Sequence, residues 1–214
     1  MDFFLDTADI NDIKPLIATG LIKGVTTNPT LIAKNGGNFE QVIVEICDLV
    51  KGPVSAEVVA DQAQDMITEG KKLAQLNGHI VIKLPITLEG LKACYAMSEE
   101  GIATNMTLCF SLSQALMAAN AGARFVSPFV GRLDDIGQSG SSLVRDIVDT
   151  FQMYALDTMV LAASLRTPQH VMDAALCGAD CATIPPKLMY QLIEHPLTDK
   201  GLDIFNRDWQ QYKR

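Results

Sequence analysis

Hydrophobic patterns typical of strands and of helices alternate along the whole chain. Short runs of apolar residues, many of them β-branched or aromatic, indicate buried strands, and the longer segments between them place apolar residues at helical spacing. The predicted strands span residues 3–6, 24–27, 54–59, 79–85, 102–108, 125–130, 159–163 and 182–184. The predicted helices span residues 9–19, 39–50, 62–76, 87–99 and 111–121, followed by one ending near 155, one starting at 167, one ending near 193 and a last one over 199–212.

Eight strands that each precede a helix predict an α/β fold, a single (β/α)₈ TIM barrel over residues 1–214. An open, doubly wound sheet is the alternative, but it would carry a glycine-rich fingerprint after its first strand, which this chain lacks. The last helix, within residues 198–214, has no further strand to cover. We expect it either to close one end of the barrel or to pack on a neighbouring subunit.

One predicted strand, His79 to Pro85, carries a lysine near its end. Its other members are mainly Ile, Val and Leu, so the strand is expected to be buried on both faces. A buried ammonium loses its hydration, which is costly. Lys83 is therefore either a strand-end residue that reaches solvent, or an amine with a lowered pKa that attacks a carbonyl.

Composition and charge exclude several kinds of partner. With a formal net charge of -8 and scattered Lys and Arg, the chain has no evident basic face for nucleic acid. Its apolar runs are far shorter than the roughly 20 residues that span a membrane. The acidic N-terminal segment does not fit a signal peptide, so a cytoplasmic protein without a membrane partner is predicted. The cysteines show no metal-ligand spacing, which predicts free buried thiols and no metal site; they are Cys47, Cys94, Cys109, Cys177 and Cys181.

Polar side chains lie at or just after the end of every predicted strand. In a TIM barrel these ends meet at one face, where active sites lie. Each residue has a local explanation as well, such as helix capping by Asp6 or Ser164, but eight such coincidences at one face favour a single site. Thr183 is the polar residue of the eighth strand. The candidate site residues at the other strand ends are Asp6, Thr26, Asn28, Glu57, Lys83, Asn105, Thr107, Ser127, Phe129, Arg132, Ser164 and Arg166.

These residue types suit Schiff-base chemistry on a carbonyl compound. Lys83 would attack as a neutral amine, while Glu57 relays protons through a water held by Thr107. Asp6 is the remaining carboxylate, available as the base for carbon–carbon cleavage. Asn28, Asn105 and Ser127 can donate and accept hydrogen bonds with sugar hydroxyls. The cations Arg132 and Arg166, together with Ser164 at a helix N-terminus, form a cluster suited to phosphate.

Other polar residues fit ordinary structural roles. The three histidines lie outside the strand ends, and His170 falls within a helix, so none is expected to be a ligand or general base. Asp134 and Asp135 fit a solvated loop, with a role beside the phosphate as the alternative. Residues 137–142 fit a flexible active-site loop better than a phosphate cradle, because the P-loop lysine is missing.

Several motifs together resemble the transaldolase family, and most closely its short bacterial branch, which includes the fructose 6-phosphate aldolases. The segment Gly24-Val25-Thr26-Thr27-Asn28-Pro29 combined with Ile82-Lys83-Leu84-Pro85 is highly specific. Leu5-Asp6-Thr7-Ala8 and residues 104–108, 127–132, 162–166 and 205–210 extend the resemblance over essentially the whole chain.

The resemblance implies the roles already suggested by chemistry: Lys83 as the Schiff-base lysine, Asp6 as the acid/base, and Glu57 with Thr107 as the water-holding pair. It also implies a cofactor-free transfer within the pentose phosphate pathway. The unit transferred is dihydroxyacetone, the donors are sedoheptulose 7-phosphate or fructose 6-phosphate, and the acceptors are glyceraldehyde 3-phosphate or erythrose 4-phosphate. Short members form ring-shaped homo-oligomers, pentamers or decamers, in which the C-terminal helix reaches a neighbour.

Two positions distinguish the branches of the family. The resemblance implies glutamine and tyrosine in the aldolases where this chain has Glu57 and Phe129. A phenol can protonate the intermediate towards release, whereas a phenyl ring leaves it to wait for a second aldehyde. A transaldolase is therefore favoured, and the alternatives are a fructose 6-phosphate aldolase and a non-catalytic sugar-phosphate-binding barrel.

Overall fold

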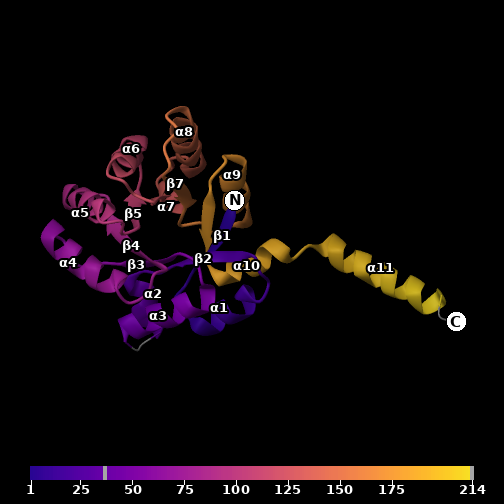
Figure 1. Cartoon of the computed structure of the whole chain (residues 1–214). Coiled ribbons are helices and arrows are strands. Elements are labelled where there is room, and N and C mark those ends of the chain that lie inside the picture. Colours follow the sequence, from indigo (N-terminus) through magenta and orange to yellow (C-terminus); the bar gives the residue numbers. More distant parts are fainter. Residues whose placement is uncertain (36–37, 213–214) are drawn as a thin grey trace.

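The computed structural model describes residues 1–35 and 38–212. Within them, eight parallel strands close into a barrel in sequence order, with helices arranged around it (Figure 1), which confirms the predicted (β/α)₈ TIM barrel. The strands are β1 (Asp2–Asp6), β2 (Ile22–Thr26), β3 (Val54–Glu57), β4 (Ile80–Pro85), β5 (Thr104–Cys109), β6 (Phe125–Pro128), β7 (Met159–Ala162) and β8 (Cys181–Ile184). The helices are α1 (Ile10–Ile17), α2 (Pro29–Asn35), α3 (Phe39–Val50), α4 (Ala63–Ala74), α5 (Leu88–Glu99), α6 (Leu112–Asn120), α7 (Val130–Asp134), α8 (Gly140–Met153), α9 (Pro168–Leu176), α10 (Pro186–Ile193) and α11 (Pro196–Tyr212).

Side chains alternate between the inside and the outside of the barrel along each strand. On β4, Ile82 and Leu84 belong to the core beneath the helices, whereas Lys83 lines a cavity inside the barrel mouth. A separate apolar cluster fills the interior away from that mouth; it consists of Phe4, Val81, Phe125, Leu161 and Cys181. Gly24 makes room for it, because a Cβ at this position would overlap the Phe4 ring. The barrel interior is thus apolar at one end and polar at the other.

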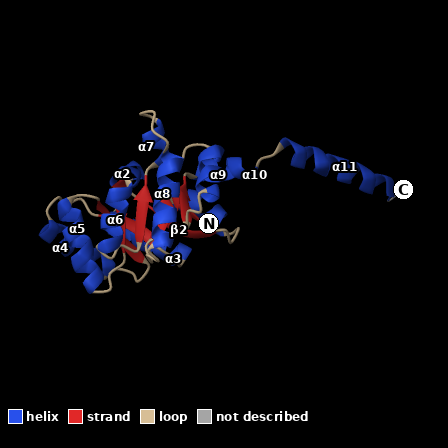
Figure 2. Cartoon of the chain, turned by 90° about the horizontal axis from the view of Figure 1, so that it is seen from above, coloured by secondary structure: helices blue, strands red, loops and turns tan. Residues whose placement is uncertain are grey.

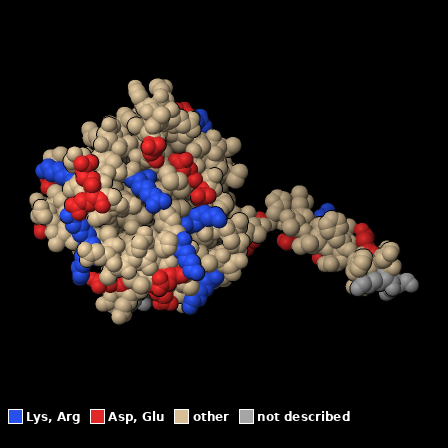
Figure 3. Space-filling model, viewed as in Figure 1, with Lys and Arg blue, Asp and Glu red and all other residues tan. Residues whose placement is uncertain are grey.

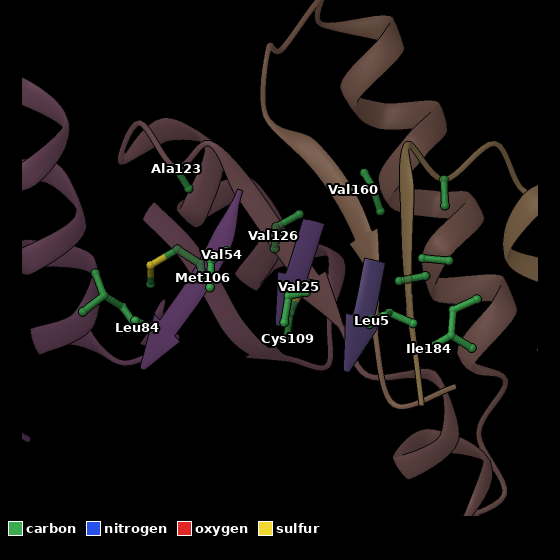
Figure 4. Close-up of a cluster of buried hydrophobic side chains, with 14 of the residues drawn as sticks. Leu5, Val25, Val54, Leu84, Met106, Cys109, Ala123, Val126, Val160 and Ile184 are labelled. Carbon is green, nitrogen blue, oxygen red and sulfur yellow. The ribbon is translucent and has the colours of Figure 1, made fainter. Parts of the chain in front are cut away.

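The outward-facing side chains form the main core between the strands and the helices. Figure 4 shows members of it from several strands, including Leu5, Val25, Val54 and Leu84. Burial of one such side chain contributes about 1.5–3 kcal/mol. This packing holds the strands, and therefore their inward-facing polar residues, in fixed positions.

Two short helices at the barrel mouth, α2 and α7, are missed by the sequence pattern. Asn28 Oδ1 caps α2 by accepting a hydrogen bond from Leu31 N at 3.0 Å, and Pro29 takes the first helical position, where its missing N–H costs nothing. The predicted strand over 125–130 instead ends at Pro128, and α7 begins at Val130.

Two further boundaries differ from prediction. Residues 140–142, expected within a flexible loop, form the first turn of α8, because Ser139 Oγ caps it by accepting from Ser142 N at 3.2 Å. Strand β3 ends at Glu57 rather than residue 59. Glu69 on α4 accepts hydrogen bonds from Val59 N and Ala60 N at 3.1 Å, which turns this backbone away from the sheet.

Helix α11 extends away from the barrel in both views (Figures 1 and 2). No residue from Pro196 to Tyr212 is buried, and large apolar side chains such as Leu197 and Phe205 are exposed along it. The first alternative for this helix, closure of one end of the barrel, is therefore wrong. Residues 213–214 of the expected helix lie outside the described part. Among the helices of the described residues, none combines the length and the apolar character needed to cross a membrane.

Candidate functional site

A cavity of about 500 Å³ opens at the carboxyl ends of the strands. Inward-facing residues of β1, β2, β3, β4, β5, β6 and β8 supply its polar floor, and α2, α7 and the segment after β7 supply its rim. Its lining residues are Asp6, Thr26, Asn28, Pro29, Thr30, Leu31, Glu57, Lys83, Thr107, Leu108, Ser127, Phe129, Arg132, Ala163, Ser164 and Thr183. Ten of the twelve candidate residues from the sequence line this cavity; Asn105 and Arg166 do not.

Lys83 is buried, with 6% of its surface exposed, so the strand-end explanation in which it reaches solvent is wrong. Its Nζ lies 3.0 Å from Glu57 Oε2, on the register-matched residue of the neighbouring strand. The same Nζ donates a hydrogen bond to the Thr27 carbonyl oxygen at 3.1 Å. The amine is thus held in place and has a carboxylate within direct proton-transfer distance.

Asp6 sits on β1 and is half-buried at the cavity floor. Burial raises the pKa of its carboxyl above the usual 3.8, although the hydrogen bond from Thr26 and the charge of Lys83 act in the opposite direction. Thr26 Oγ1 donates to Asp6 Oδ1 at 2.8 Å and lies 2.6 Å from Thr183 Oγ1. Because Thr26 gives its single proton to Asp6, Thr183 donates to Thr26. Asp6 is thereby oriented by a chain of two hydroxyls.

Thr107 Oγ1 is buried and has no hydrogen-bond partner among the described residues. A buried polar atom in this condition costs free energy unless water or a ligand satisfies it. Because Thr107 lines the cavity, its hydroxyl is available to a water or a substrate there.

Asn105 lies below the cavity surface rather than on it. Its Nδ2 donates to Ser55 Oγ at 3.0 Å, and its Oδ1 accepts from Ser127 Oγ at 2.7 Å. It therefore fixes the Ser127 hydroxyl, and Ser127, unlike Asn105, lines the cavity. Asn28 does face the cavity, and its Oδ1 is occupied by the cap of α2, so its amide presents N–H donors.

The rim residues after β6 and β7 are also fixed by contacts. The Phe129 ring packs edge-on against Phe110 with centroids 5.8 Å apart, and the Arg132 guanidinium lies 4.9 Å above the same ring. Ser164 adopts a left-handed backbone (φ 58°), a strained conformation for a residue with a Cβ. Such strain is common at functional sites, and here it occurs on the cavity wall.

Arg166 is exposed on the loop between β7 and α9. Its Nη1 lies 2.6 Å from Asp135 Oδ1, and this hydrogen bond holds the pKa of the Asp135 carboxyl below its usual range. Its backbone N–H donates to His170 Nδ1 at 3.2 Å, and His170 Nε2 lies 3.2 Å from Asp134 Oδ2. Asp134 and Asp135 are exposed, as expected, but Asp134 is the last residue of α7 rather than part of a loop, and both are tied to the Arg166 segment.

The basic side chains in the cavity lining are Lys83 and Arg132. On the face of the molecule shown in Figure 3, basic and acidic side chains are interspersed. An anion in the cavity would therefore be attracted by individual groups such as Arg132 rather than by a broad positive field.

The thiols and possible metal ligands add nothing to the cavity. All five cysteines are free and buried, as predicted. Burial raises the pKa of the Cys109 thiol to about 11, which keeps it protonated and unreactive near neutral pH. In the described part of the chain, no cluster of three His, Cys, Asp or Glu is arranged to hold a metal ion.

The sequence assigned no site role to His170, which the structure connects to Arg166 and Asp134. Thr183 was identified at the end of the eighth strand, and it bonds to Thr26 at the cavity floor. Asp134 at the end of α7, Asp135 and His170 make contacts that cross between elements, so no local pattern indicates those contacts.

Comparison with known proteins gives consistent matches. Residues 3–214 match the family model described as transaldolase/fructose-6-phosphate aldolase. A protein described as a probable transaldolase from Maricaulis maris is 57% identical over 211 residues, covering 99% of this chain and 97% of the relative. One with the same description from Desulfosudis oleivorans is 54% identical over 214 residues, covering 100% of both chains. A third, from Symbiobacterium thermophilum, is 52% identical over 213 residues, covering 100% and 99%.

Proposed function

The chain belongs to the transaldolase/fructose-6-phosphate aldolase family, and from this premise we propose that it is a transaldolase acting through a Schiff base on Lys83. The observation that carries the proposal is the buried Lys83 amine, 3.0 Å from Glu57 in a polar cavity at the barrel mouth. The donors are sedoheptulose 7-phosphate or fructose 6-phosphate, and the acceptors are erythrose 4-phosphate or glyceraldehyde 3-phosphate.

The first half-reaction forms the imine. Glu57 takes a proton from Lys83, whose neutral amine attacks the ketone carbon of the donor. The resulting carbinolamine loses water after protonation of its hydroxyl. A water held by the Thr107 hydroxyl carries that proton from Glu57, which uses the buried group that has no partner among the described residues.

The second step breaks the carbon–carbon bond. Asp6 removes the proton of the donor's C4 hydroxyl, the C3–C4 bond breaks, and its electron pair moves into the enamine on Lys83. The aldose phosphate leaves as an aldehyde. Attack of the enamine on the acceptor aldehyde, with Asp6 returning the proton, and hydrolysis of the imine complete the cycle. Burial at the cavity floor favours a protonated Asp6 and so supports its return of that proton.

Reductive trapping tests the covalent step directly. Incubation with fructose 6-phosphate and borohydride is expected to add one dihydroxyacetone-derived group to the protein, located on Lys83 by peptide mass spectrometry. If Lys83 remains unmodified, or another residue carries the adduct, the mechanism is wrong. A non-catalytic sugar-phosphate-binding barrel would give no adduct at all.

The fate of the enamine distinguishes a transaldolase from an aldolase, and Phe129 is the residue to change. Phe129→Tyr places a phenol at the cavity wall, where it can protonate the enamine. We expect release of free dihydroxyacetone without an acceptor to rise by about tenfold or more, within the range of general acid catalysis. A coupled assay for dihydroxyacetone measures this rate.

Phe110→Tyr is the matched control, because its ring packs against Phe129 without lining the cavity. Its release rate should stay at the wild-type level. Equal rates for Phe129→Tyr and wild type would remove the argument that Phe129 favours transfer. High release by the wild type itself would favour the fructose 6-phosphate aldolase.

Assembly and location follow the same premise. We propose a homo-oligomer of five or ten chains in which α11 packs on a neighbouring copy, supported by its exposed apolar side chains. Sugar phosphates of the pentose phosphate pathway as substrates are compatible with action in the cytoplasm. The chemistry derived above uses side chains alone and no cofactor.

A further inference from the structure

His170 lies in the first turn of α9, outside the cavity lining, and its imidazole is half-buried. Both ring nitrogens have partners on other segments. Nδ1 accepts from Arg166 N at 3.2 Å, and Nε2 lies 3.2 Å from Asp134 Oδ2. Helix α9 does not need this side chain as a cap, because Thr167 Oγ1 already accepts from His170 N. The imidazole therefore connects the end of α7 with the segment between β7 and α9.

The hydrogen bonds assign the tautomer. Because Nδ1 accepts from a backbone N–H, the proton of the neutral ring is on Nε2 and points to Asp134. The other oxygen of that carboxylate, Oδ1, accepts from Gly140 N at 3.0 Å, at the start of α8. The start of α8, Asp134, His170 and the backbone of Arg166 thus form one continuous series of contacts.

The segment held by this series is the one that brings Ser164 and Arg166 to the barrel mouth. Its first anchor is the Ser164 carbonyl, which accepts from Gly131 N at 3.1 Å. Its second is the Arg166 N–H on His170, and its third is the Arg166 guanidinium on Asp135. That third contact joins two exposed side chains and is weak in water. The bond to His170 is therefore the anchor that fixes the backbone of Arg166 itself.

We propose that His170 is a positioning residue for phosphate binding: through Nδ1 it holds the backbone of Arg166, and Asp134 holds the imidazole in the required orientation. The proposal rests on the proposed function and takes Ser164 and Arg166 as the residues that bind the substrate phosphate, the role expected for them from the sequence. Carboxylate–histidine pairs orient metal ligands by the same principle, with the histidine set by its outer partner. Here the oriented group is a backbone amide.

Two substitutions test the roles of the two imidazole nitrogens separately. In His170→Asn, the amide oxygen takes approximately the place of Nδ1 and can still accept from Arg166 N. In His170→Gln, the amide nitrogen reaches the place of Nε2 and can still donate to Asp134, while the acceptor for Arg166 is lost. Gln169→Ala on the same helix turn is the control, because the Gln169 side chain points along α9 and donates to Asp173 Oδ1 at 2.7 Å.

The readout is borohydride trapping of Lys83 as a function of donor concentration, with fructose 6-phosphate and with fructose. For His170→Gln we expect the half-saturating concentration of fructose 6-phosphate to rise by about tenfold, the effect of one lost hydrogen bond. The maximal trapping rate, and both values for fructose, should stay within about twofold of wild type. His170→Asn and Gln169→Ala should resemble the wild type with both donors.

Two results would overturn the proposal: equal behaviour of His170→Gln and His170→Asn with fructose 6-phosphate, or a parallel loss with both donors, which indicates general distortion. Should His170→Gln not fold, Asp134→Asn replaces it. That variant keeps an acceptor for Gly140 N but turns an amide N–H towards Nε2, which moves the ring proton to Nδ1. Nδ1 can then no longer accept from Arg166 N, so the same selective loss is expected.

Binding of inorganic phosphate tests the role of His170 independently of the proposed Schiff-base mechanism. If wild-type Lys83 forms no adduct, the Schiff-base mechanism fails, whatever His170 does. Calorimetric titration with inorganic phosphate still tests His170: an affinity about tenfold weaker in His170→Gln than in His170→Asn supports the positioning role, and equal affinities contradict it.

Discussion

Lys83→Met is expected to abolish turnover, with kcat lower by a factor on the order of 10⁴ or more. Methionine preserves the length and much of the volume of the buried side chain but has no amine to form the imine. The hydrogen bond to the Thr27 carbonyl and the ion pair with Glu57 are lost with it. Steady-state assay and the borohydride experiment should agree: no transfer and no adduct.

Lys92→Met is the matched control, since Lys92 also pairs with a glutamate, Glu89, at 2.6 Å, but on the exposed surface of α5. It should retain wild-type kcat. Circular dichroism checks that both variants fold. Substantial turnover by folded Lys83→Met would place the chemistry on another residue.

Asp6→Asn is expected to lower kcat by about 10²–10⁴-fold, because the base that takes the C4 hydroxyl proton is lost. The same change should stabilise the protein near neutral pH. Burial raises the pKa of Asp6, so ionising it costs more in the folded than in the unfolded chain. Asparagine resembles the neutral carboxyl and keeps an acceptor for Thr26.

The direction of the pH dependence follows from the raised pKa. Between the unfolded value of 3.8 and the higher folded value, the folded protein holds a proton that the unfolded chain has released. The free energy of unfolding of the wild type therefore falls as pH rises through this window and stays lower above it. Asp6→Asn does not undergo that loss. Its higher free energy of unfolding relative to wild type is therefore present at pH 7–8 and disappears below pH 3.8.

Denaturant melts at several pH values measure this difference. Single stabilising substitutions commonly gain about 0.5–2 kcal/mol, and each kcal/mol raises Tm by about 2–4 °C in a domain of this size. Asp61→Asn, an exposed acid in the loop after β3, removes the same charge and should show no such pH-dependent gain. A variant Asp6→Asn that is less stable than wild type at pH 7 would contradict the burial argument.

The sequence predicted the barrel and most of the cavity because both depend on local alternation. Lys83 and Thr107 face inward for the same reason that Ile82 and Met106 face outward, and a period of two is visible in the chain. Short helices α2 and α7 escaped because a helix of five to seven residues has too few positions to show its own period.

Contacts between segments distant in the sequence could not be predicted from the hydrophobic pattern. His170 appears in the sequence as an ordinary helical residue, and Asp134 as a loop acid, yet their side chains meet across two βα units. Asn105 shows a related limit. Its inward direction was predictable, but only the distances to Ser55 and Ser127 reveal that both its amide nitrogen and its amide oxygen have partners below the cavity.

The stability of helix α11 and the chemistry of the cavity depend on different parts of the assembly. The cavity is lined by the strand ends and loops of one chain, whereas the 17 residues of α11 receive no burial from that chain. Most of the stability of a helix in a protein comes from packing of its apolar face rather than from the helix alone. In the proposed assembly, the free energy that keeps α11 helical is therefore supplied by mass action, as if each neighbour were a ligand. Dilution would dissociate the neighbouring chains and so destabilise α11 first. The chemistry at Lys83 would still depend on a single chain.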